Sequence, residues 1–168
     1  MDPGGLWYLN PMSTLNEAVT DFLAQKRVAV AGVSRHRQSP ANFVYRKLRD
    51  SGHEVFPVNP AATELEGVPC YPDLASIPGG VTAVVVMTPP AAAEGVVREG
   101  ARLGIRRVWL HRSFGQGSVS AAAVAAAREA QLMLIPAGCP AMFCEPVDLG
   151  HKCFRWCLKL TGRLPAQV

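Results

Sequence analysis

Long hydrophobic runs are missing from this 168-residue sequence. Its longest apolar stretches, VAVAGV, AVVVM and AAAVAAA, are far shorter than the roughly 18 to 20 residues that a membrane-spanning helix needs. The first residues, MDPGGLWYLNP, lack both the basic region and the apolar region of a secretory signal. From these absences we expect a cytoplasmic protein with no membrane partner.

Charged residues are scarce as well. They make up 18% of the chain, whereas hydrophobic residues make up 49%, a balance typical of a folded protein rather than a disordered one. The length suits one domain, which we expect over residues 13–168, after a flexible stretch at residues 1–12. The net charge of +4 is small and spread along the chain, so it favours an anionic small molecule and gives no reason to expect nucleic acid.

The five cysteines follow no standard framework. Four of them fall within the last 30 residues, at Cys139, Cys144, Cys153 and Cys157. An odd number of cysteines in a chain without an export signal argues against disulfide bonds. No Cys-x-x-Cys pair of the kind found in zinc and iron–sulfur sites is present. We therefore expect reduced thiols and no metal.

Strand-like and helix-like patterns alternate along the chain. Apolar runs at VAVAGV, EVFPV, VTAVVVM, RVWLH and LMLIP are typical of buried parallel strands. Helix-start signals stand between or before them: Thr14 with Glu17, Ser39 with Pro40, and Thr88 ahead of two prolines. The alternation predicts an α/β fold, a Rossmann-like doubly wound parallel sheet of about five strands in three α/β/α layers, with an additional helix at each end. We expect the strand order 3-2-1-4-5.

The last segment, PVDLGHKCFRWCLKLTGR, predicts a terminal helix with two faces. Phe154, Cys157 and Leu158 would lie on the buried face, with Cys157 as a small core residue. The other face carries a basic stripe, which is either a solvated surface or a contact for an acidic partner or a phosphate. Its members are Lys152, Arg155, Lys159 and Arg163.

The loop after the first strand, GVSRHRQSP, has the features of a phosphate-binding turn. Gly32 permits a tight turn, and Ser34 offers a hydroxyl. The helix that starts at Ser39 offers free backbone amides and the positive end of a helix dipole. These features together favour a phosphate or pyrophosphate ligand over a loop that merely turns the chain.

A nicotinamide-binding fingerprint is absent. Its second glycine would stand where this chain has Ser34, and an acidic residue would end the second strand where this chain has Asn59. These differences argue against NAD. Because Arg35 or Arg37 would be able to accept a 2′-phosphate, NADP stays open.

Five motifs together resemble a known family: VAVAGVSRHRQSP, EVFPVNP, LEGVPCYPDLASIP, VVVMTPP and GIRRVWLH. From Val28 to about Asp148 the chain is similar to small CoA-binding proteins with a Rossmann-like fold, related to the nucleotide-binding domain of the succinyl-CoA synthetase alpha subunit. The resemblance implies that coenzyme A or an acyl-CoA binds at the carboxyl edge of the sheet. It implies pyrophosphate contacts at Gly32, Val33 and Ser34 with Arg37 and Ser39 nearby, adenosine contacts at Val58, Asn59 and Pro60, and pantetheine contacts at Thr88, Pro89 and Pro90.

His111 departs from the family, whose members often have glutamine at the end of the fourth strand. It would hydrogen-bond a ligand phosphate or a pantetheine amide, unless its ring is satisfied locally. Cys139, just after the fifth strand, would form a mixed disulfide with the CoA thiol under oxidation if the two meet. The synthetase's catalytic histidine lies in a second domain, which we do not expect within these 168 residues, so ligase activity is not transferred.

We therefore expect a protein that binds or senses CoA, and we find no residue to assign to catalysis. Two enzyme readings stay open, an NADP-dependent oxidoreductase and a nucleotide-binding subunit of an acyl-CoA ligase or transferase complex. A homodimer and an unidentified protein partner also stay open.

Overall fold

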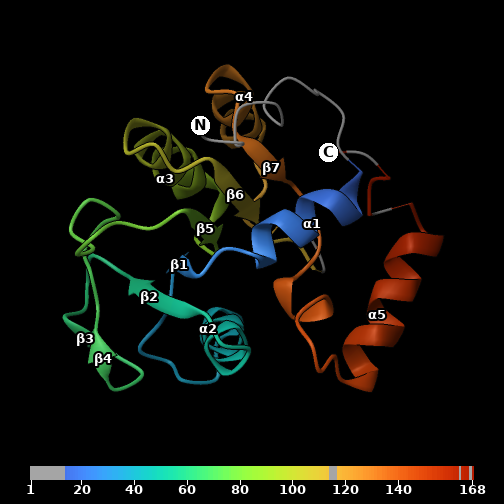
Figure 1. Cartoon of the computed structure of the whole chain (residues 1–168), viewed down its shortest axis with the longest axis horizontal. Coiled ribbons are helices and arrows are strands. Elements are labelled where there is room, and N and C mark those ends of the chain that lie inside the picture. The colour runs from blue at the N-terminus through green and yellow to red at the C-terminus, as the bar shows by residue number, and fades with distance from the viewer. Residues whose placement is uncertain (1–13, 114–116, 163, 167) are drawn as a thin grey trace, which may run out of the picture.

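The computed structural model describes residues 14–113, 117–162, 164–166 and 168, so the stretch expected to be flexible lies outside the described residues. A five-stranded parallel sheet has helices on both faces (Figure 1). The fold class expected from the sequence is therefore confirmed. The helices are α1 (Leu15–Leu23), α2 (Pro40–Asp50), α3 (Pro90–Arg102), α4 (Ala121–Glu129) and α5 (Leu149–Leu160). The strands of the sheet are β1 (Arg27–Ala31), β2 (Glu54–Val58), β5 (Ala83–Val86), β6 (Arg107–Leu110) and β7 (Met133–Ile135).

The strand order is β2-β1-β5-β6-β7, which corrects the order expected from the sequence. The expected order places the third strand of the sheet beside β2, but that strand, β5, lies beside β1, with Val28 opposite Ala83 and Ala31 opposite Val86. Burial explains the difference, because β5 is buried along its whole length, as a central strand should be. β2 contains Pro57, which has no N–H to donate and so suits the edge. The strand order now reverses between β1 and β5, and ligands bind such sheets at this point.

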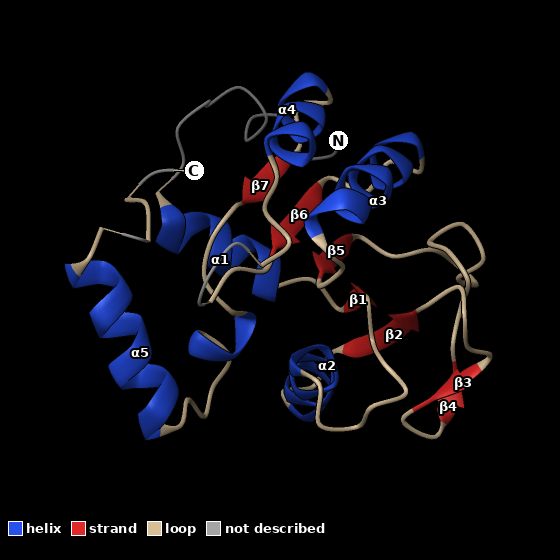
Figure 2. Ribbon diagram, turned by 180° about the vertical axis from the view of Figure 1, so that it is seen from behind, coloured by secondary structure: helices blue, strands red, loops and turns tan. Residues whose placement is uncertain are grey.

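Two hydrophobic clusters fill the space between the layers. One packs α1 and α2 against one face of the sheet, and the other packs α3 and α4 against the opposite face. Figure 2 shows these helices on the two sides of the sheet. Trp109 is fully buried in the first cluster, edge-on to Phe22 with 5.3 Å between ring centroids. Its indole N–H donates to the Ala137 carbonyl at 3.0 Å. This bond fixes the segment after β7 against β6.

The helix starts follow the sequence signals with one exception. Thr14 and Glu17 form the expected capping box, and the Ser39 hydroxyl accepts a hydrogen bond from the Asn42 amide ahead of α2. Thr88 does not cap α3, because Pro89 occupies the cap position and no side chain caps that helix. The Thr88 hydroxyl therefore makes no capping bond to α3.

Between β2 and β5 lies a short antiparallel hairpin of β3 (Glu64–Leu65) and β4 (Val68–Pro69), separate from the main sheet. Leu65 and Cys70 are buried and anchor the hairpin to the cluster beside α2. The hairpin stands beside the carboxyl end of β2, where it helps to enclose the candidate site.

The terminal helix α5 forms as expected, but it buries less than expected. Leu158 is buried and Phe154 is half-buried, whereas Cys157 is exposed, so its assignment to the core is wrong. The helix packs against the 3-10 turn Pro140–Met142. Phe154 and Leu158 join the hydrophobic cluster there, and Cys157 does not. Lys152 and Lys159 are exposed as expected, while Arg163 lies outside the described residues.

Among the described residues, no helix combines the length and the apolar composition that crossing a bilayer requires.

Candidate functional site

The carboxyl ends of three strands meet at Gly32. Its N–H donates to the Val58 carbonyl at 2.9 Å, and the Met87 N–H donates to the Ala31 carbonyl at 2.8 Å. Gly32 has a φ of 103°, and a Cβ atom placed on it would lie 2.8 Å from the Met87 carbonyl carbon. Only glycine satisfies both the backbone conformation and this close approach. The turn predicted from the sequence is therefore held against the end of β5.

Asn42, a buried residue on α2, holds the loop after β1 in place. Its side-chain oxygen accepts from the Ser34 amide at 2.9 Å and from the Ser39 hydroxyl. Its side-chain nitrogen donates to the Ser34 carbonyl at 2.8 Å and to Glu66 Oε1 at 2.7 Å. Both backbone groups of Ser34 are thus engaged. Its hydroxyl oxygen accepts from the His36 amide at 3.1 Å, and the hydroxyl proton remains available to a ligand.

Glu66 extends this network from the hairpin to α2. Its carboxylate is nearly buried, with 3% of the side chain exposed, and it lies 2.7 Å from Arg46 Nη1. Arg46 also donates to the Arg37 carbonyl at 3.0 Å. The sequence did not point to Asn42, Arg46 or Glu66, because residues so far apart in the chain leave no local pattern.

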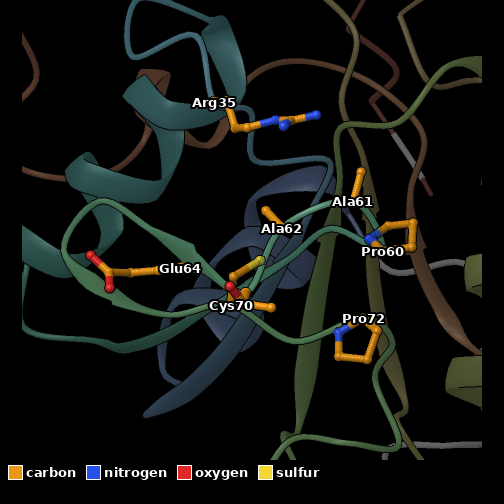
Figure 3. Close-up of a pocket in the computed structure, with 8 residues that line it drawn as sticks. Arg35, Pro60, Ala61, Ala62, Glu64, Cys70 and Pro72 are labelled. Carbon is orange, nitrogen blue, oxygen red and sulfur yellow. The ribbon is translucent and has the colours of Figure 1, made fainter.

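A cavity of about 560 Å³ opens between the loop after β1 and the chain that follows β2 (Figure 3). In Figure 3, Arg35 lies across the opening from Pro60, Ala61 and Ala62. The lining therefore combines one cation, Arg35, and one carboxylate, Glu64, with walls of mostly small side chains. The full set is Arg35, Pro60, Ala61, Ala62, Thr63, Glu64, Cys70 and Pro72.

Of the residues expected to contact adenosine, Pro60 lines this cavity and Asn59 does not. The Asn59 side chain donates to the Val33 carbonyl at 2.8 Å and accepts from the Ala61 amide at 2.8 Å. Asn59 thus joins the ends of β1 and β2. Arg35 lines the cavity, whereas Arg37 is exposed and absent from the lining. The sequence gives no reason to prefer either arginine as the one that lines the cavity, so this assignment comes from the structure.

Thr88 carries an unpaired polar atom at the switch point. Its hydroxyl oxygen is buried and is the one such side-chain atom without a hydrogen-bond partner among the residues described here. Its carbonyl accepts from the Ser118 hydroxyl at 2.7 Å. The Thr88 amide would lie 2.9 Å from a Cβ on Gly32, so the free hydroxyl belongs to the residue beside the glycine turn. A buried hydroxyl without a partner is costly unless a ligand or water completes it.

His111 lies at the carboxyl end of β6, with Nε2 2.9 Å from the Ser113 hydroxyl oxygen. Burial lowers the pKa of His111 to about 4, so the imidazole is neutral at neutral pH. The ring has a local partner, and its other nitrogen can still serve a ligand. Residues 114–116, which follow it, are not among the described residues.

Cys139 does not suit thiol exchange. It is 5% exposed, and burial raises the pKa of its thiol to about 12, whereas exchange requires a thiolate. Cys70, not Cys139, lines the cavity, and burial raises the pKa of that thiol too. No cluster of three or more potential metal-ligating side chains occurs within the described ranges.

The chain is similar to known proteins in both sequence and structure. A family model described as CoA binding domain matches residues 26–145. An ADP-forming acetate–CoA ligase of Archaeoglobus fulgidus is 34% identical over 74 residues, which are 44% of the chain and 11% of the ligase. The chain thus spans only a small part of that enzyme.

Solved structures have the same fold. A hypothetical protein from Pyrococcus horikoshii OT3 superposes with a TM-score of 0.69 at 28% identity, over 74% of this chain and 86% of that protein. An acetyl-coenzyme A synthetase of Ca. Korarchaeum cryptofilum, solved with phosphate and ADP, superposes with a TM-score of 0.57 at 25% identity, over 66% of this chain and 25% of the synthetase.

The close approach at Gly32 can be measured as stability. Gly32→Ala and Gly52→Ala both force alanine into a positive φ, but a Cβ on Gly52 meets nothing within 4 Å. We expect Gly32→Ala to lower the free energy of unfolding by about 1–3 kcal/mol more than Gly52→Ala, because backbone atoms of Met87 and Thr88 must move. Urea denaturation of the two variants gives the difference. Equal losses would show that the strand ends are not tightly packed.

Protonation of His111 should destabilise the fold at mildly acidic pH. The folded-state pKa of about 4 lies below the ordinary value of 6.5. As pH falls from 6.5 towards 4, the unfolded chain binds a proton that the folded chain does not, and stability declines by at most about 1.4 kcal/mol per pH unit. Urea denaturation across this range should show a shallower decline for His111→Gln than for the wild type. Identical slopes would contradict the neutral, buried ring.

Proposed function

This chain belongs to the family of CoA-binding domains, and from that premise we propose that it binds coenzyme A or an acyl-CoA at the carboxyl edge of its sheet. The observation that carries the proposal is the meeting of Gly32 with Met87 and Thr88 at the switch point, beside a cavity that holds Arg35. A pyrophosphate between nucleoside and pantetheine needs a close backbone approach, free hydroxyls and positive charge. The site offers all three.

The pyrophosphate would lie over the glycine turn. Gly32 and Val33 provide close backbone there, Ser34 provides its hydroxyl proton, and α2 begins at Ser39 without an acidic residue in its first turn. The helix itself places no carboxylate at the positive end of the α2 dipole, and the nearby Glu66 carboxylate is paired with Arg46. Arg37 is exposed in the same loop and would add a second cation for the ligand.

The adenosine end would occupy the cavity. Pro60, Ala61 and Pro72 supply apolar walls for the base, while Arg35 supplies the charge for the ribose 3′-phosphate. Val58 and Asn59 would support this wall without lining it. Val58 is buried, and the Asn59 side chain joins the ends of β1 and β2.

Pantetheine would run from the pyrophosphate at the glycine turn past Thr88, Pro89 and Pro90 towards His111. The unpaired Thr88 hydroxyl would gain a hydrogen-bond partner from the ligand. We propose a binding, sensing or presenting role without catalysis. The activity of the ligase is not carried over, because the similarity covers only 11% of that enzyme. Arg35 would also suit the 2′-phosphate of NADP, which makes NADP the competing ligand.

Calorimetric titration with CoA, acetyl-CoA, NADP and NAD tests the proposal. We expect saturable binding of CoA or acetyl-CoA at least tenfold tighter than of either nicotinamide cofactor. Ser34→Tyr should abolish this binding without changing the unfolding temperature, because the ring fills the turn. Ser34→Ala, the matched control, keeps both backbone bonds to Asn42 and should lose only a few-fold in affinity. Binding of NADP but not of CoA would refute the proposal.

The role of Arg35 is separable from binding as such. Arg35→Ala should weaken CoA binding by about 10- to 100-fold, the value of a charge-assisted bond to phosphate, and leave dephospho-CoA unaffected. Arg102→Ala is the control, since Arg102 is an exposed arginine at the far end of α3. Equal losses for both ligands would mean that Arg35 does not contact the 3′-phosphate.

A further inference from the structure

The helix α5 presents an apolar outer face. Leu149, Trp156 and Leu160 are 80%, 63% and 66% exposed, and Cys153 and Cys157 are exposed beside them. Leu149, Cys153, Trp156 and Leu160 follow at spacings of four, three and four residues, which places them on one side of the helix. We call these four residues, together with Cys157 beside them, the outer stripe. The proposed CoA site accounts for none of them.

Positive charge runs along one border of the outer stripe. Lys152 and Lys159 are exposed, and neither forms an ion pair with a described residue. The one acidic residue at this helix is its cap, Asp148, which accepts from the His151 amide at 3.0 Å and lies 2.7 Å from the His151 ring. Arg155 points inward, to the Met142 carbonyl at 3.1 Å. An apolar strip flanked by lysines therefore faces outward.

We propose that the outer stripe docks on the surface of an anionic lipid bilayer, with α5 lying in the plane of the interface. Leucine, tryptophan and thiol side chains enter the boundary between headgroups and acyl chains, and the flanking lysines meet the anionic headgroups. The absence of a spanning run led us to expect no membrane partner. That absence does not bear on a helix that lies along the surface.

Charge and area both favour a bilayer over a second copy of the chain. A 12-residue helix is about 18 Å long, and one such stripe buries far less than the roughly 800 Å² per partner of a stable protein interface. Antiparallel pairing of two copies would also bring Lys152 of one beside Lys159 of the other. The lysines that disfavour this pairing are the groups that an anionic surface attracts.

Docking would leave the candidate CoA site open. In both views of the chain, α5 stands at the end opposite the β3–β4 hairpin, which borders the cavity (Figures 1 and 2). The docking proposal therefore does not depend on the proposed function, and each can fail alone.

Co-sedimentation of the full chain with vesicles tests the proposal, under reducing conditions. We expect binding to vesicles of one part phosphatidylserine to two parts phosphatidylcholine, weakened by salt, and little binding to phosphatidylcholine alone. Trp156→Asp and the double variant Lys152→Glu, Lys159→Glu should each reduce binding at least tenfold. Leu103→Asp is the matched control, because Leu103 is 46% exposed at the end of α3 and should leave binding unchanged.

Urea denaturation of Trp156→Asp should match the wild type, which excludes misfolding as the cause of lost binding. Equal binding of Trp156→Asp and wild type, or equal binding to neutral and anionic vesicles, would overturn the proposal. So would a wild-type dimer in light scattering that Trp156→Asp dissociates while neither protein binds vesicles, since the stripe would then contact a second copy.

Discussion

The rest of the site depends on one close contact, the approach of Gly32 to the backbone of Met87 and Thr88. It places the turn after β1 directly against the end of β5, at the point where the strand order reverses. Any side chain at Gly32 would separate the two strand ends and widen the crevice between them. The contact brings the turn that leads to Ser34 next to the segment that carries Thr88.

The loop beyond that contact is held by side chains rather than by regular secondary structure. Asn42 bonds to both backbone groups of Ser34, and Glu66 joins Asn42 to Arg46. A buried amide with all of these bonds made favours this loop conformation, because a conformation that breaks them would leave buried polar groups unpaired. A loop fixed in this way loses little conformational entropy on binding a ligand, since its ordering is complete before the ligand arrives.

The sequence predicted those features that depend on neighbouring residues. The apolar runs, the capping box at Thr14 and the helix start at Ser39 are local patterns, and all occur in the structure. The predicted strand order was wrong because no local pattern says which strands are neighbours, although a proline such as Pro57 favours an edge position for β2. The prediction that Thr88 caps α3 was wrong because Pro89 occupies the cap position. Asn42, Glu66 and the choice of Arg35 over Arg37 rest on contacts across many residues, which one sequence does not reveal.

The bond between Glu66 and Asn42 closes a loop of the chain that contains β2, since it joins residues 24 apart. The cavity takes its lining from the loop after β1 on one side and from residues up to Pro72 on the other. Asn42 holds the first of these segments and Glu66 belongs to the second, so their bond ties the two walls together. A substitution at either residue therefore changes the shape of the cavity, although neither residue lines it.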